Sequence, residues 1–147
     1  RQSEMNTQRL TSDIKRHEGW SATVYEDSRG YQTIGYGFLV DPELDGAGLS
    51  KAEGDFILNN RLQERIVRLE TKLDFFERLN EARQRALVNM SYQLGVSGLM
   101  SFKDMLAALA EGDYDTAAKE ALNSNWAKIQ TPNRAQEIAE MIRYGED

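Results

Sequence analysis

The amino-acid sequence predicts an α+β fold that is mostly α-helical. Three features of the 147 residues lead to this prediction. The N-terminus has a helix-forming segment, a short stretch after it has the turn residues of a β-hairpin, and the rest shows helical periodicity. A chain of this length buries roughly 70% of the surface that it exposes when unfolded, so it needs neither a metal nor a disulfide to fold. We expect a single domain, residues 1–147, built of two lobes.

The first lobe is expected to be small, to span about residues 1–50, and to contain one helix and one hairpin. The helix runs from about Thr7 to Glu18 and carries Leu10 and Ile14 on one face. Residues 22–40 have the pattern of a strand, a turn with the sequence DSRG, and a second strand.

A long helix over residues 51–73 is expected to connect this lobe to the next. The polar loop DPELDGAG comes before it and is expected to face solvent. Ser50 and Glu53 then form a capping box, in which the side chain of each residue accepts a hydrogen bond from the backbone of the other. The helix that they open is roughly 35 Å long if it reaches Leu73.

The second lobe, about residues 74–147, is expected to be all-helical. Its helices are predicted at about residues 81–94, 102–111 and 113–123, followed by one that opens at Thr131 and Pro132. Threonine is suited to the N-cap position of a helix, and proline to its first turn. A cleft between the two lobes is the expected binding site.

Composition excludes several kinds of function. The chain has no cysteine and one histidine, so thiol catalysis and cysteine-based metal sites are excluded, and we expect no metal and no cofactor. The net charge of −6 argues against nucleic acid as a partner and against attraction to an anionic membrane or cell wall. No apolar run approaches the roughly 18 residues of a membrane-spanning helix, and no heptad pattern demands a dimer, so we expect a monomer.

The stretch EGWSATVYEDSRGYQTIGYGF, from Glu18 to Phe38, is the candidate site because it is richer in rings and glycines than a hairpin requires. Glu18 ends a helix, where the macrodipole disfavours a negative charge and so favours a protonated acid. Asp27 lies in the hairpin turn, and Thr33 lies in the strand that returns. A solvated glutamate, a turn-capping aspartate and an ordinary strand threonine are the alternative interpretations of the three positions.

Taken together, the three residues indicate glycoside hydrolysis. The hairpin folds back towards the helix end, so we expect Glu18 and Asp27 on opposite walls of one groove, with Thr33 facing it. Hydrolysis of a glycosidic bond needs one neutral carboxyl as acid and one ionised carboxylate as base or nucleophile. Opposite walls favour the wider carboxyl separation of inverting enzymes.

The same residues resemble a known family. The spacing of Glu18, Asp27 and Thr33, followed by IGYG, resembles the phage lysozymes of glycoside hydrolase family 24, the T-even phage endolysin type. The distant segment SNWAKIQTPNRA is similar to that family's W…QTPNRA signature, and SYQLGVSGLMSF resembles the segment between them. The resemblance covers the chain from about Met5 to Tyr144.

The resemblance implies a lysozyme-like fold and an endolysin-like muramidase that cleaves the β-1,4 bond between N-acetylmuramic acid and N-acetylglucosamine in peptidoglycan. It implies that Glu18 is the general acid, and that Asp27 with Thr33 activates the attacking water. The other positions that it assigns are Leu39 and Tyr92 along the sugar groove, Gln93 and Trp126 as support of the cleft, and Arg134 as the partner of the acid.

The sequence departs from the family pattern in two respects. Phe38 stands where the family often has histidine, so apolar packing is expected in place of an ion pair. The chain is acidic, whereas most endolysins of this type are basic, and it begins at Arg1. We therefore expect part of a larger phage protein, made in the host cytoplasm, virion-associated, and acting on the wall in the host periplasm.

Two other functions compete with hydrolysis. A lytic transglycosylase attacks the same bond with a single glutamate and without water, and Asp27 and Thr33 at hydrolase spacing argue against it. A catalytically inactive wall-binding or structural module of a phage particle would be expected to have lost the acid or the base, and both are present.

Overall fold

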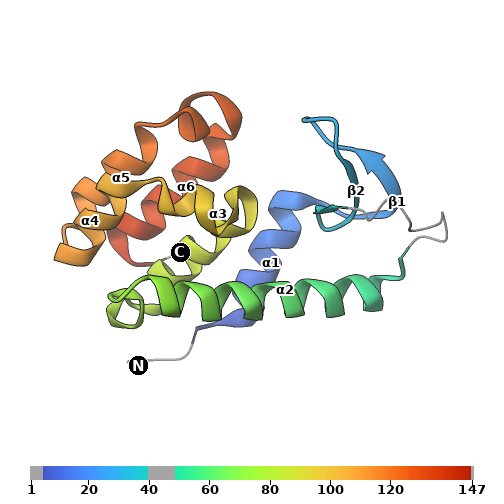
Figure 1. Cartoon of the computed structure of the whole chain (residues 1–147), viewed down its shortest axis with the longest axis horizontal. Helices are drawn as coiled ribbons and strands as arrows, with labels where there is room; N and C mark the ends of the chain where they lie inside the picture. Colours follow the sequence, from blue (N-terminus) through green and yellow to red (C-terminus); the bar gives the residue numbers. More distant parts are fainter. Residues whose placement is uncertain (1–4, 40–48, 147) are drawn as a thin grey trace. The chain divides into compact units, whose positions relative to one another are not determined.

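A computed structural model describes residues 5–39 and 49–146 and is shown in Figure 1. The chain divides into two compact units, which we call the N-terminal unit (residues 8–63) and the C-terminal unit (residues 64–146, with residues 5–7). The boundary falls within helix α2, Lys51–Lys72. The expected division into a lobe, a connecting helix and a second lobe stays a prediction.

The N-terminal unit contains α1, a small antiparallel sheet with strand order β1-β2-β3, and the first part of α2 (Figure 1). The bounds are Thr7–Glu18 for α1, Ser21–Glu26 for β1, Gln32–Gly35 for β2 and Phe38–Leu39 for β3. The predicted helix and hairpin are confirmed. The third strand was not predicted, because only the loop residues Tyr36 and Gly37 separate it from β2. Val40 and the predicted loop over residues 41–48 lie outside the described residues.

The N-terminal unit has a mainly aliphatic core, which includes Leu10 and Leu58, and aromatic rings pack beside it. The ring centroid of Tyr36 lies 4.9 Å from that of Trp20 and 6.3 Å from that of Phe38. A β-carbon at Gly54 of α2 would overlap the Trp20 ring, so glycine allows this helix to approach. Phe38 is only 2% exposed, and the Arg61 guanidinium lies 4.9 Å above its ring, so the apolar packing expected at Phe38 is present.

The predicted capping box opens α2. Ser50 Oγ accepts a hydrogen bond from the Glu53 backbone N–H at 3.1 Å, and Glu53 Oε1 accepts one from the Ser50 backbone N–H at 3.0 Å. Both bonds satisfy N–H groups that a helix start leaves without partners. From this start α2 continues to Lys72, one residue short of the predicted Leu73.

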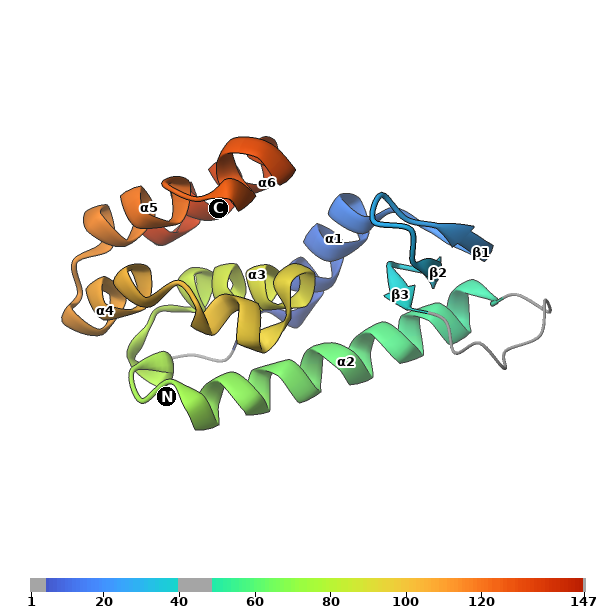
Figure 2. The same cartoon turned by 45° about the horizontal axis from the view of Figure 1, so that its top comes forward.

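The C-terminal unit is helical, as predicted. Its elements are η1 (Phe76–Arg78), α3 (Glu81–Met100), α4 (Lys103–Glu111), α5 (Tyr114–Leu122), η2 (Trp126–Gln130) and α6 (Pro132–Tyr144). Helix α5 packs between α4 and α6, and α6 also packs on α3 (Figures 1 and 2). Helix α3 extends beyond the predicted end near residue 94, because the chain resumes helical turns after the non-helical Gly95. The π-helical turn η2 was not predicted.

Thr131 is at the predicted N-cap position of α6, but its side chain has another role. It occupies the N-cap position of α6 and Pro132 follows it in the first turn, but the Thr131 side chain makes no capping hydrogen bond. Its Oγ1 instead accepts a hydrogen bond from Gln93 Nε2 at 3.2 Å. The hydroxyl is thus engaged by a neighbouring helix, a tertiary contact that the local sequence does not reveal.

Candidate active site

The N-terminal unit places both predicted catalytic carboxylates near one tyrosine. Glu18 is the last residue of α1, Asp27 directly follows β1, and Tyr25 lies in β1 between them in sequence. The pKa of the Tyr25 phenol is raised, first by partial burial and then by the negative charges of Glu18 and Asp27. Because such charge effects weaken with distance, both carboxylates lie within electrostatic reach of the Tyr25 phenol. Tyr25 itself is 37% exposed.

The hairpin turn holds the Asp27 carboxylate in place. Oδ1 accepts hydrogen bonds from the backbone N–H groups of Arg29 at 2.9 Å and Tyr31 at 2.8 Å. Aspartate is common in turns because its side chain can make such bonds. No residue that the structure describes donates to Oδ2. One oxygen therefore fixes the group, and the other is available to accept a proton.

Thr33 is connected to Asp27 through the backbone of Tyr31. Thr33 lies in β2, opposite Tyr25 on one side and Leu39 on the other, and is 2% exposed. Its hydroxyl donates to the Tyr31 carbonyl at 3.0 Å, whereas the Tyr31 N–H donates to Asp27. The Thr33 hydroxyl proton is engaged, so the lone pairs of its oxygen are what remain for a water molecule.

Gly37, in the loop between β2 and β3, is a site residue that the sequence reasoning missed. A β-carbon built there would lie 2.6 Å from Glu18 Oε1, so the carboxyl rests directly against the glycine. Gly37 also has a φ of +77°, which residues with a side chain rarely adopt. Its position in the GYG motif marks Gly37 as a residue of interest in the sequence. The contact with Glu18, however, forms only when the chain folds.

The C-terminal unit contains a second group of predicted residues, beginning with Arg134. This side chain is 9% exposed, and its Nε and Nη2 donate to Asn89 Oδ1 at 3.1 and 2.8 Å. Asn89 was not predicted, although it lies one helical turn before Gln93 on α3 and therefore shares its face. The amide of Asn89 holds the guanidinium in a fixed orientation.

Gln93 and Trp126 are in contact, as the resemblance implies. Trp126 Nε1 donates to Gln93 Oε1 at 2.9 Å, and Gln93 Nε2 donates to Thr131. Trp126 is 3% exposed and meets Phe102 edge-on, with ring centroids 5.9 Å apart. Trp126 begins η2, and π-helical turns are frequent at functional sites.

The two residues assigned to the sugar groove differ in accessibility. Leu39 is 58% exposed at the end of β3. Tyr92 is 9% exposed, and the Arg65 guanidinium lies 5.1 Å above its ring. Leu39 therefore offers an apolar surface to a ligand, whereas little of Tyr92 does.

Each unit thus gathers its own predicted residues: Glu18, Asp27, Thr33 and Leu39 in the N-terminal unit, and Tyr92, Gln93, Trp126 and Arg134 in the C-terminal unit. Within residues 5–39 and 49–146, no three histidine, aspartate or glutamate side chains are grouped to hold a metal ion. No helix in the described part of the chain is both long and apolar enough to cross a membrane.

Two candidate carboxylates near one tyrosine, on a helix-plus-hairpin unit, suit a glycoside hydrolase of the lysozyme type. A family model described as phage lysozyme matches residues 15–139, and the chain belongs to that family. The resemblance found in the sequence is therefore confirmed.

Three relatives are similar over most of this chain. It is 34% identical to the pre-baseplate central spike protein Gp5 of Enterobacteria phage T4, over 90% of this chain and 27% of that protein. It is 31% identical to the probable T4-type lysozyme 1 of Dictyostelium discoideum, over 90% of this chain and 92% of that protein. The probable T4-type lysozyme 2 of the same organism is 27% identical, over 92% and 94% of the two chains. The chain thus spans a minor part of the spike protein.

The contact between Gly37 and Glu18 gives a first prediction. If Glu18 is the acid, as the sequence predicts, Gly37→Ala should lower hydrolysis by about 10²-fold, because misplacing a catalytic group by about 1 Å has an effect of that size. Gly112→Ala is the matched control: Gly112 also has a φ of +77°, but a β-carbon there would have no described atom within 4 Å. Turbidity loss and thermal midpoint should be measured for both. Equal activities would contradict the positioning role of Gly37.

Proposed function

We propose that this chain hydrolyses the β-1,4 bond between N-acetylmuramic acid and N-acetylglucosamine in bacterial peptidoglycan, with inversion at the anomeric carbon. The observation that carries the proposal is that Glu18, at the end of α1, and Asp27, directly after β1, both lie within electrostatic reach of the Tyr25 phenol. Membership of the phage lysozyme family supports the class of substrate.

In this proposal Glu18 is the general acid. Its proton moves to the glycosidic oxygen as the bond from that oxygen to the anomeric carbon breaks. Contact with Gly37 fixes where the carboxyl lies, because a proton donor must be within hydrogen-bond reach of the leaving oxygen.

Asp27 is the general base. Its Oδ2 removes a proton from the water that attacks the anomeric carbon, while the two backbone bonds to Oδ1 hold the carboxylate still. The hydroxyl oxygen of Thr33 accepts a hydrogen bond from the other O–H group of that water and so helps to orient it. One water molecule is consumed for each bond broken. Glu18 then regains a proton and Asp27 loses one to solvent, which restores both groups.

The remaining assignments are also part of the proposal. The exposed side chain of Leu39 suits an apolar face of a sugar ring. The hydrogen bonds of Gln93 and Trp126 with each other, and of Arg134 with Asn89, suit groups that must be held rigidly. Their supporting role, the contribution of Tyr92 to the groove and the pairing of Arg134 with the acid stay predictions from the resemblance.

The stereochemistry of the product tests the mechanism. Inverting glycosidases separate their carboxyls by about 6.5–9.5 Å to leave room for a water, against about 5–5.5 Å in retaining enzymes. We expect the β-linked glycan to release the α-anomer first, which proton NMR detects before mutarotation. An initial β-anomer would make Asp27 a nucleophile. A 1,6-anhydro product would identify a transglycosylase instead.

We also propose that the chain acts as a module of a phage particle that is brought to the wall of the host. The match to a segment of a spike protein of phage T4 supports this setting. The net charge of −6 supports it as well, because an acidic protein is not attracted to an anionic wall.

A further inference from the structure

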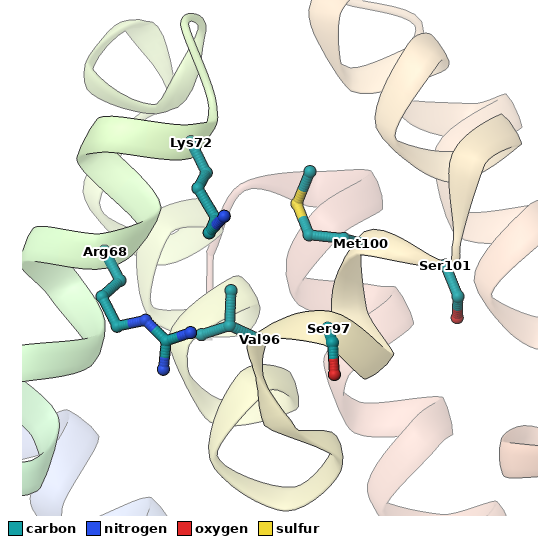
Figure 3. Close-up of a pocket in the computed structure, with 6 residues that line it drawn as sticks. All are labelled: Arg68, Lys72, Val96, Ser97, Met100 and Ser101. Atoms are coloured by element: carbon teal, nitrogen blue, oxygen red, sulfur yellow. The ribbon is translucent and has the colours of Figure 1, made fainter.

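A pocket in the C-terminal unit, separate from the residues assigned above, combines two cations with an apolar wall. It has a volume of about 430 Å³ and is lined by Arg68, Lys72, Val96, Ser97, Met100 and Ser101. The cations come from the last turns of α2, and the other residues come from the part of α3 that follows Gly95 and from its C-cap, Ser101 (Figure 3). We call it the α2–α3 pocket.

The two cations at this pocket have no partner among the residues that the structure describes. Within residues 5–39 and 49–146, neither the Arg68 guanidinium nor the Lys72 ammonium makes an ion pair or a hydrogen bond. Arg65, on the same helix, is engaged: it donates to the Ser91 carbonyl and covers the Tyr92 ring. Like charges one helical turn apart repel each other, so the pair Arg68 and Lys72 destabilises α2 slightly. A bound anion would offset this repulsion.

The wall of the pocket indicates the kind of anion. Figure 3 shows the side chains of Arg68 and Lys72 extending from α2 towards the segment that carries Val96 and Met100. Arginine binds planar carboxylates and phosphates through paired N–H groups, and lysine adds a point charge. Val96 and Met100 offer an apolar surface next to these groups. A ligand that satisfies both features has an oxyanion with a small aliphatic group beside it.

We propose that the α2–α3 pocket binds a small oxyanion that carries an aliphatic group, such as the C-terminal carboxylate of a short peptide. A phosphate group is the other source of the same oxyanion chemistry. The proposal concerns binding and does not depend on the hydrolysis proposed above.

Binding can be tested by NMR on the whole ¹⁵N-labelled chain. The probes are N-acetyl-alanyl-alanine, the same dipeptide with its C-terminus amidated, and inorganic phosphate, read at the backbone amides of Ser97 and Ser101. We expect saturable shifts for the dipeptide with a Kd of roughly millimolar order, as for other fragments of this size. The amidated dipeptide, which lacks the charge, should bind at least about tenfold more weakly.

Two double variants distinguish binding at the pocket from a general effect of the protein's positive charge. Arg68→Ala with Lys72→Ala should weaken binding of the dipeptide by about tenfold or more, because charge-assisted hydrogen bonds are lost. Arg78→Ala with Lys103→Ala removes the same charge from exposed positions of this unit outside the pocket, and should leave binding unchanged. The spectra themselves report whether each variant is folded.

The outcomes are distinct. Tighter binding of phosphate than of the dipeptide, lost in the pocket variant alone, would support the oxyanion site and identify phosphate as its source. Absence of shifts with both anions, or an equal effect of the two double variants, would overturn the proposal. Hydrolysis is not measured, so neither result bears on the proposed function.

Discussion

Glu18→Gln is expected to reduce hydrolysis of peptidoglycan by about 10²–10⁴-fold, the usual contribution of a general acid. The amide has nearly the shape of the carboxyl and can keep the same place against Gly37, but it has no proton to give to the leaving oxygen. Turbidity loss of outer-membrane-permeabilised cells measures the effect.

The matched control for this prediction is Glu26→Gln. Glu26 ends β1 in the same unit and is exposed, so the substitution removes the same charge without removing the proposed acid. Its activity and thermal midpoint should stay close to those of the unchanged protein. If Glu18→Gln cleared cells at a rate close to that of Glu26→Gln, another residue would have to supply the proton.

Much of the fold follows from local sequence rules, and the predicted elements that are confirmed are those with a local cause. The helix over Thr7–Glu18 has apolar residues at helical spacing, and α2 opens at a capping box that can be recognised from Ser50 and Glu53 alone. The helical elements of the C-terminal unit are likewise visible from periodicity. These signals require no knowledge of distant contacts.

The elements that were missed depend on contacts or on unusual backbone geometry. Strand β3 has two residues, too few for an alternation to be recognised, and it exists because it pairs with β2. The turn η2 is π-helical. Such turns are rare, and no simple residue pattern predicts them. Helix α3 crosses Gly95, where the sequence suggests an end, because helical turns resume on the far side.

In the candidate site, too, some residues can be recognised from local sequence and others only from their contacts in the folded chain. Glu18, Asp27 and Thr33 could be chosen from residue type, spacing and resemblance, and the nearness of Glu18 and Asp27 to Tyr25 agrees with that choice. Gly37 and Asn89 could not, because their importance lies in which side chain they touch. A glycine that makes room for a carboxyl and an asparagine that orients a guanidinium resemble many other glycines and asparagines in sequence.

Asp27→Asn is expected to lower hydrolysis by about 10²–10⁴-fold while leaving the hairpin intact. The amide oxygen of asparagine can still accept the two backbone hydrogen bonds from Arg29 and Tyr31, so the turn keeps its shape. The nitrogen that replaces Oδ2 cannot take a proton from water, so the base is lost.

Two further variants separate the chemical role of Asp27 from its role in the turn. Asp27→Ala removes the base and both turn hydrogen bonds, so it should lose activity to a similar extent and also lower the unfolding free energy, by about 1–3 kcal/mol. Asp74→Asn, at an exposed position after α2, controls for the change of charge and should keep full activity. Activity and thermal unfolding of the three variants should be measured side by side. Near-normal hydrolysis by Asp27→Asn would mean that Asp27 only shapes the turn, and that the attacking water is activated elsewhere.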